Sequence, residues 1–135
     1  MSNINAAIGK VQIKKFKKFN ERKIEVAKMY DEAFGDIPEI KLLKTDYDSI
    51  GLFAYIIRVK SGRNELIDFL NKKEIGAGIH YTPVHFFSYY RKFATPLPIT
   101  ERASEEIITL PCFPDITNEE VDNVIKAVKE FFKNR

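Results

Sequence analysis

The chain has 135 residues, of which 44% are hydrophobic and 30% charged, and its formal net charge is +3 at pH 7. This length predicts one domain spanning residues 1–135 with a sizeable core, and the composition excludes a disordered chain. The near balance of 22 basic and 19 acidic residues argues against a nucleic-acid partner. The single cysteine, Cys112, excludes an internal disulfide and favours a cytoplasmic location. No apolar run is long enough to span a bilayer, so we expect no membrane contact.

Residues 3–34 read as a long helix, because apolar side chains recur at helical spacing through most of this segment. Ser2 or Asn3 can cap its start, and Gly35 followed by Pro38 ends it. The first part of the apolar stripe consists of Ile4, Ile8 and Val11.

The middle of the chain alternates strand and helix signals. A short strand is expected at Ile40–Leu43 and a central, well-covered strand at Gly51–Val59, which is rich in aromatic and β-branched residues. Asn64–Lys73 reads as a helix, Gly76–Tyr81 as a third strand, and Phe86–Phe93 as a short helical turn.

The last third predicts two helices joined by an apolar loop. Thr100 can cap a helix through about Ile107, and the loop Leu110–Pro114 follows. Thr117–Glu120 has the spacing of a capping box at the start of a terminal helix. This element order predicts an α+β fold with a small, largely antiparallel sheet of three to four strands, helices mostly on one face, and a long N-terminal helix.

The most informative segment holds the only two histidines, His80 and His85, with glycines before them and aromatic residues after them. A histidine beside Tyr81 suggests a binding site or an interface. We expect no metal, because no second cysteine exists and no carboxylate falls between Gly76 and Thr95. Cys112, between prolines in an apolar context, reads as a packing residue rather than a nucleophile.

Two other clusters each have a functional and a structural interpretation. A lysine-rich stretch could bind phosphate, but acidic residues follow it on the same helix, which favours a solvated helix face. It comprises Lys14, Lys15, Lys17, Lys18, Arg22 and Lys23. An aromatic set could stack on a base or sugar, or could close a core or build a subunit contact. It comprises Phe86, Phe87, Tyr89, Tyr90 and Phe93.

Three segments in this order resemble one family: Asn5–Ile13, Gly78–His85, and Leu97–Arg102 running on to Leu110–Pro114. The pattern resembles the C-terminal small domain of the DegT/DnrJ/StrS aminotransferases, and it covers essentially the whole chain. The resemblance implies a fold like the C-terminal domain of fold-type I PLP aminotransferases. It also implies pyridoxal phosphate (PLP) chemistry on keto-sugars attached to nucleotides.

The resemblance also implies what this sequence lacks. The family's catalytic lysine, its aspartate under the pyridine nitrogen and most of its phosphate-binding residues belong to a large domain that has no counterpart here. Met1-Ser2 resembles the interior of the family's arginine-methionine-serine run, so the chain is expected to start where the family's second half starts. We therefore expect no catalytic, cofactor-binding or metal-binding residue in this chain, and no PLP bound to it alone.

Carried over residue by residue, His80 and Tyr81 match the histidine-tyrosine pair expected to border the nucleotide-sugar pocket. His85 matches the second histidine, which orients the loop or contacts substrate. Arg102 matches an arginine expected to anchor loops by ion pairing. Cys112 stands where the family commonly has an aliphatic residue, which favours packing.

Three hypotheses follow. The first is the small domain of a nucleotide-sugar aminotransferase, completed by a separately encoded large-domain chain. The second is a non-catalytic remnant or binding module for a sugar nucleotide or a protein. The third, ranked far below, is a nucleic-acid module using the lysine-rich stretch. We also expect self-association, most simply a symmetric dimer that covers an apolar patch around Ile4, Ile8, Val11 and the Phe86–Phe93 cluster.

Overall fold

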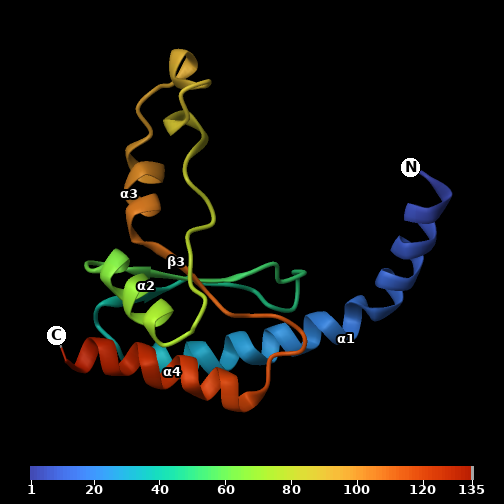
Figure 1. Cartoon of the computed structure of the whole chain (residues 1–135), viewed down its shortest axis with the longest axis horizontal. Helices are drawn as coiled ribbons and strands as arrows, with labels where there is room; N and C mark the ends of the chain where they lie inside the picture. The colour runs from blue at the N-terminus through green and yellow to red at the C-terminus, as the bar shows by residue number, and fades with distance from the viewer. Residues whose placement is uncertain (135) are drawn as a thin grey trace.

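The computed structural model describes residues 1–134 and confirms the predicted α+β class. Figure 1 shows helices around a small sheet, with the N-terminal end of the first helix and a long central segment extending away from it. The elements are α1 (Asn3–Phe34), β1 (Ile40–Leu42), β2 (Tyr55–Val59), α2 (Arg63–Lys72), α3 (Pro98–Glu106), β3 (Ile107–Leu110) and α4 (Asn118–Lys133), with 3-10 turns at Val84–Phe86 and Arg91–Phe93.

The sheet is antiparallel, with strand order β1-β2-β3. The predicted central strand is therefore confirmed, although its paired part begins at Tyr55 and the residues before it are unpaired. Ile57 lies opposite Leu42 on one side and Ile108 on the other. Alternate residues of β2 are buried, which is the period-two pattern of a strand whose one face is covered.

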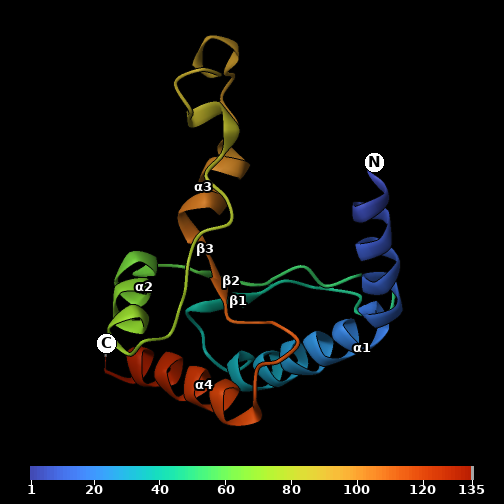
Figure 2. The same cartoon turned by 45° about the vertical axis from the view of Figure 1, so that its right-hand side comes forward.

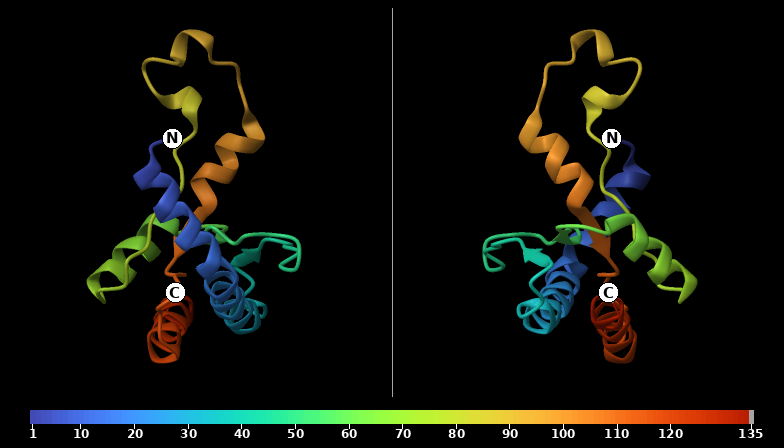
Figure 3. Two further views of the ribbon diagram at one scale, coloured as in Figure 1. Left: turned by 90° about the vertical axis from the view of Figure 1, so that its right-hand side faces the viewer. Right: turned by 90° about the vertical axis from the view of Figure 1, so that its left-hand side faces the viewer.

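Helices α1 and α4 lie side by side against one face of the sheet, and α2 packs on α4 and β3 (Figures 1 and 3). This arrangement explains the helical spacing of apolar residues in α4 and in the second half of α1, since each buries one stripe in the core. The fully buried large side chains of this core are Tyr30, Phe34, Ile57, Leu66, Leu70, Ile108, Leu110, Val26, Val59, Val121 and Val128.

Both long helices begin with the caps that the sequence predicts. The Ser2 hydroxyl accepts a hydrogen bond from the Asn5 amide at 3.3 Å. At α4 the Thr117 hydroxyl accepts from the Glu120 amide at 3.2 Å, and the Glu120 carboxylate accepts from the Thr117 amide at 2.7 Å. The Thr117 amide, and then the Thr117 hydroxyl at 2.9 Å, donate to the Glu120 carboxylate and hold its pKa below the ordinary value, because both bonds favour the ionised form.

The third strand lies elsewhere than predicted. Gly76–Tyr81 is not a strand, because only Gly78 pairs with β3, through reciprocal backbone bonds to Thr109, before the chain turns away. Instead Ile107–Leu110, which we had read as a helix end and a loop, forms β3. Thr100 does not cap α3, which begins at Pro98 after Leu97.

Two segments extend from the packed body (residues 20–78 and 107–134) toward the same side, as Figure 2 shows. We call residues 1–19 the N-terminal projection and residues 79–106 the arm. The body ends where α1 meets the loop before β2, since Asn20 donates to the Ile50 carbonyl at 2.9 Å and accepts from the Leu52 amide at 2.7 Å. A Cβ added at Gly51 would lie 2.9 Å from the far end of the exposed Phe16 ring, so that side chain would have to shift.

Candidate functional site

The arm leaves the sheet and returns to it at one point. Reciprocal hydrogen bonds join Gly78 to Thr109 of β3, at 3.2 and 2.8 Å, so the two ends of the arm lie side by side. Between these ends the chain holds the histidine motif, the aromatic set and α3. No residue of the arm is buried. The arm therefore presents its side chains for contact with something other than the core.

His80 and Tyr81 lie at the start of the arm and are both exposed. Their rings meet edge to face, with 4.9 Å between centroids, and the peptide bond between them is cis. The Tyr81 side chain is 67% exposed. An imidazole and a phenol in this position can both donate and accept hydrogen bonds, the combination that hydroxyl-rich and phosphate-bearing ligands require.

His85 is held differently from His80. Its side chain is only 14% exposed, and its Nε2 lies 3.2 Å from Oε1 of Glu101 on α3. The same Glu101 oxygen accepts the Leu97 amide at 2.9 Å. This contact ties the His85 ring to α3, while its two predicted roles, orienting the loop and contacting substrate, stay predictions.

A second carboxylate fastens α3 to the sheet. Glu106 accepts from Arg58 of β2 at 2.6 Å and from Arg102, one turn earlier in the helix, at 3.1 Å. Arg58, and to a lesser degree Arg102, holds the pKa of Glu106 below its ordinary value. Arg102 thus forms an ion pair, but its partner lies in the same helix, so the expected anchoring of loops stays a prediction. These roles of Glu101 and Glu106 could not be read from the sequence. The contacts of Glu101 with His85 and of Glu106 with Arg58 join residues 16 and 48 positions apart.

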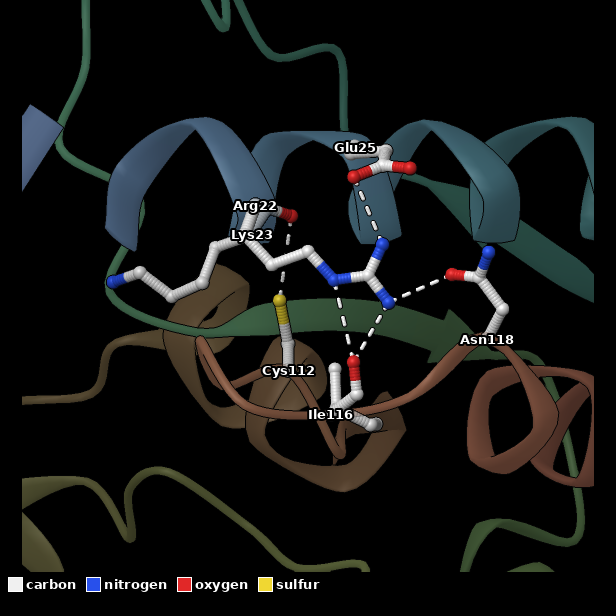
Figure 4. A network of polar contacts seen from close by, with 6 residues as sticks. All are labelled: Arg22, Lys23, Glu25, Cys112, Ile116 and Asn118. Atoms are coloured by element: carbon white, nitrogen blue, oxygen red, sulfur yellow. Dashed lines mark hydrogen bonds and ion pairs between the residues drawn. The ribbon is translucent and has the colours of Figure 1, made fainter. Parts of the chain in front are cut away.

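Part of the lysine-rich stretch has a structural role. Arg22 donates to the Ile116 carbonyl at 2.7 Å and to the Asn118 side chain at 2.8 Å, and it pairs with Glu25 at 2.8 Å (Figure 4). Lys23 donates to the Leu52 carbonyl. These two residues therefore connect α1 to loops of the body rather than presenting charge to a phosphate.

Cys112 packs against the core, in agreement with the structural interpretation. Its thiol points at the Lys23 carbonyl, 3.5 Å away (Figure 4). Burial raises the pKa of this thiol to about 11, so the nucleophilic thiolate is disfavoured. Within residues 1–134 there is also no group of three or more histidine, cysteine, aspartate or glutamate residues placed to hold a metal. None of the described helices combines the length and apolarity that crossing a membrane requires.

The residues present do not fit PLP. A lysine that forms a Schiff base needs a desolvated or cationic environment, and the cofactor's ring nitrogen needs an acidic partner. Every lysine except Lys23 is exposed, and Lys23 is engaged with the Leu52 carbonyl. No charged residue is buried in the described part of the chain.

Large apolar side chains are exposed on both the N-terminal projection and the arm. On α1 they include Ile4 (73%), Ile8 (56%) and Val11 (49%), and the aromatic set of the arm is also exposed. Of the two structural roles predicted for that set, closing a core is wrong, because none of its rings reaches the core cluster. The exposed apolar residues are grouped rather than scattered singly over the surface, and such groups are typical of a contact region.

Comparison with known proteins gives a consistent result. The model of the DegT/DnrJ/EryC1/StrS aminotransferase family matches residues 1–129. The aminotransferase TlmJ from Streptoalloteichus hindustanus superposes with a TM-score of 0.86 and 25% identity, over 96% of this chain and 36% of TlmJ. DesV from S. venezuelae, solved in complex with a ketimine intermediate, superposes with a TM-score of 0.86 and 26% identity. The match covers 95% of this chain and 36% of DesV.

Helicobacter pylori PseC, an aminotransferase involved in the biosynthesis of pseudoaminic acid, gives a TM-score of 0.84 and 26% identity. The match covers 98% of this chain and 38% of PseC. This chain therefore spans little more than a third of the length of these relatives, and it superposes on them throughout.

Proposed function

This chain belongs to the DegT/DnrJ/EryC1/StrS aminotransferase family, and we propose that it forms the small-domain part of a PLP-dependent aminotransferase acting on nucleotide-linked keto-sugars. The observation that carries the proposal is the family match over residues 1–129, with the histidine motif exposed on the arm. In this proposal the aminotransferase acts in the cytoplasm, in the biosynthesis of amino sugars or cell-surface polysaccharides.

In this proposal His80 and Tyr81 border the nucleotide-sugar pocket, and His85 completes the same site. The imidazole of His80 and the hydroxyl of Tyr81 can bind diphosphate oxygens and sugar hydroxyls. Their exposure supports this role, because a residue with no packing function is available to a ligand. The chain contributes binding and orientation, and no catalytic group.

We further propose that the isolated chain does not transaminate. PLP supplies the electron sink of the family's chemistry when it is bound, and that site requires the lysine of a large domain. The exposed lysines of this chain support the proposal, since none has the desolvated environment that activates a Schiff-base lysine. The proposed partner is a chain or domain that carries that lysine.

Co-expression tests the partnership. We expect this chain to form a stable complex with a family large domain that carries the Schiff-base lysine, and the complex to show cofactor absorbance and transaminate a nucleotide-linked keto-sugar. His80→Ala combined with Tyr81→Ala should raise KM for the sugar while leaving the complex intact. Failure to associate, with no cofactor absorbance, would refute the partnership.

Ligand binding by the isolated chain is a separate test. Titration with UDP-N-acetylglucosamine or dTDP-glucose to several millimolar should shift the backbone amide signals of His80 and Tyr81 in NMR spectra. Tyr89→Ala, a change at another exposed tyrosine of the arm, should leave those shifts unchanged. Shifts without any association with a large domain would favour the binding-module alternative, and no shift would count against a sugar-nucleotide site.

The exposed apolar surfaces lead us to propose self-association as well. A symmetric dimer could cover Ile4, Ile8 and Val11 together with the aromatic set of the arm. Sedimentation should show a dimer at high protein concentration, and Ile4→Lys combined with Ile8→Lys should shift it toward monomer. A clean monomer of the unaltered chain at high concentration would contradict this proposal.

A further inference from the structure

One oxygen of Glu101 holds two separate parts of the arm. Oε1 lies 3.2 Å from Nε2 of His85 and 2.9 Å from the amide nitrogen of Leu97. Leu97 is the residue before α3, and its side chain does not cap that helix. We propose that Glu101 is a positioning residue, which fixes the histidine segment against α3 and selects the ring tautomer of His85.

The tautomer follows from hydrogen-bond chemistry. An ionised carboxylate can only accept hydrogen bonds, so Nε2 of His85 must carry the hydrogen that bonds to Glu101. In the neutral ring this leaves Nδ1 with a free lone pair, and Nδ1 has no hydrogen-bond partner among residues 1–134. Glu101 therefore determines which ring nitrogen of His85 can accept a bond from a ligand.

Glu101 is itself well placed to act as an anchor. Its carbonyl accepts the Ser104 hydroxyl at 2.7 Å. Arg63 of α2 donates to the carbonyls of Ser104 and Ile107, each at 3.2 Å. Since Glu106 also joins α3 to Arg58 of the central strand, α3 is fixed to the body near its C-terminal end. Glu101 extends that attachment to the 3-10 turn Val84–Phe86, which carries His85.

The consequence is confined to the arm. The Glu101 side chain is 35% exposed, and no residue between Gly76 and Glu106 is buried. Loss of the carboxylate should therefore loosen the histidine segment without unfolding the core. That this attachment positions His85 for a substrate rests on the proposed function, whereas the contact between Glu101 and His85 does not.

The experiment compares Glu101→Ala, Glu101→Gln and a control, Glu105→Ala, which removes an exposed carboxylate of the same helix. Ring nitrogen shifts should show His85 with hydrogen on Nε2 in the unaltered chain and in Glu101→Gln, because the glutamine oxygen can accept the same bonds. Glu101→Ala should lose this preference and exchange the Leu97 amide about tenfold faster, the loss expected for one modest hydrogen bond. The control should resemble the unaltered chain.

Two results would overturn the inference. The first is a neutral His85 in the unaltered chain that carries its hydrogen on Nδ1. The second is a Glu101→Ala variant whose ring shifts and Leu97 exchange match those of the control. Both are measured without ligand. If the ring and amide change as expected but UDP-N-acetylglucosamine and dTDP-glucose cause no shift at His80, the attachment stands and the proposed sugar-nucleotide site fails.

Discussion

The body and the arm of this protein both carry aromatic and aliphatic residues but use them in opposite ways. In the body, the apolar side chains of α1, β2 and α4 face one another and are buried. In the arm, Phe87, Tyr89 and Phe93 are at least half exposed, and position is maintained by a few polar contacts at Glu101 and Glu106. Burial thus stabilises the fold in one region, while the other keeps its apolar residues available for contact. The sequence motifs shared with the family lie largely outside the core.

The largest expected effect comes from the same change made in each region. Ile108 of β3 is fully buried, whereas Ile99 of α3 is 86% exposed. Ile108→Ala should lower the free energy of unfolding by about 2–5 kcal/mol, because it removes buried methyl groups and leaves a cavity. Ile99→Ala should change it by less than about 0.5 kcal/mol. Urea unfolding followed by circular dichroism measures both, and equal losses would break the distinction between body and arm.

A smaller effect is expected for a buried hydroxyl. Tyr55 is 4% exposed and donates to Asp31 at 2.7 Å, while Tyr47 donates to the other oxygen of that carboxylate at 2.7 Å. Tyr55→Phe should cost about 1.5–3 kcal/mol, the range for a hydrogen bond to a charged group. Tyr89→Phe, in the arm, should cost nothing measurable by the same urea titration. If Tyr55→Phe leaves the free energy of unfolding unchanged, the hydrogen bond from Tyr47 alone is sufficient for the Asp31 carboxylate.

The same tyrosine makes the body sensitive to alkali. Burial, followed by the hydrogen bond to Asp31, raises the pKa of Tyr55 far above its ordinary value of 10.0. The folded state therefore keeps a proton that the unfolded state loses, so stability is complete below about pH 10 and falls as the pH rises further. The loss approaches about 1.4 kcal/mol per pH unit for one tyrosine. Urea midpoints from pH 8 to 11 test this, and Tyr55→Phe should flatten the decline.

The smallest expected effect concerns the two helix caps. Thr117→Ala should lower the free energy of unfolding by about 1 kcal/mol, because α4 is part of the core. Ser2→Ala should leave global unfolding unchanged and only accelerate exchange of the Asn5 amide, because the N-terminal projection has no buried residue. The Thr117 effect should weaken as the pH falls from about 4.5 through the lower pKa that Glu120 has in the folded state, because protonation of Glu120 removes its side of the capping box. Equal global losses for the two variants would show that the projection folds with the core.

Local signals predicted most of the body. The periodicity of α1, the capping box at Thr117 and the β-branched run of β2 each depend on neighbours in the sequence. The failures have a common cause. Ile107–Leu110 is a short apolar run directly after a helix, where periodicity cannot separate a helix end from a buried strand. Only its pairing with β2 decides the matter, and that pairing joins residues about fifty positions apart in the sequence.

The site follows the same rule. The resemblance to the family predicted His80, Tyr81 and His85 as site residues, and the structure places all three near the start of the arm. It did not identify Glu101, whose contact with His85 arises because α3 folds back along the histidine segment. Contacts of this kind depend on the direction that a helix takes after a loop, which neither residue type nor spacing encodes.

The bridge between Gly78 and Thr109 has a consequence for how such a chain can diversify. Because the arm starts and ends at a single pair of residues on a sheet edge, its length and composition can change without moving any strand of the body. The entropic cost of closing a loop rises only slowly with its length, so insertions there are tolerated. An arm from another chain of this fold should therefore be accepted at this junction. The arm can then be replaced while the sheet keeps its structure.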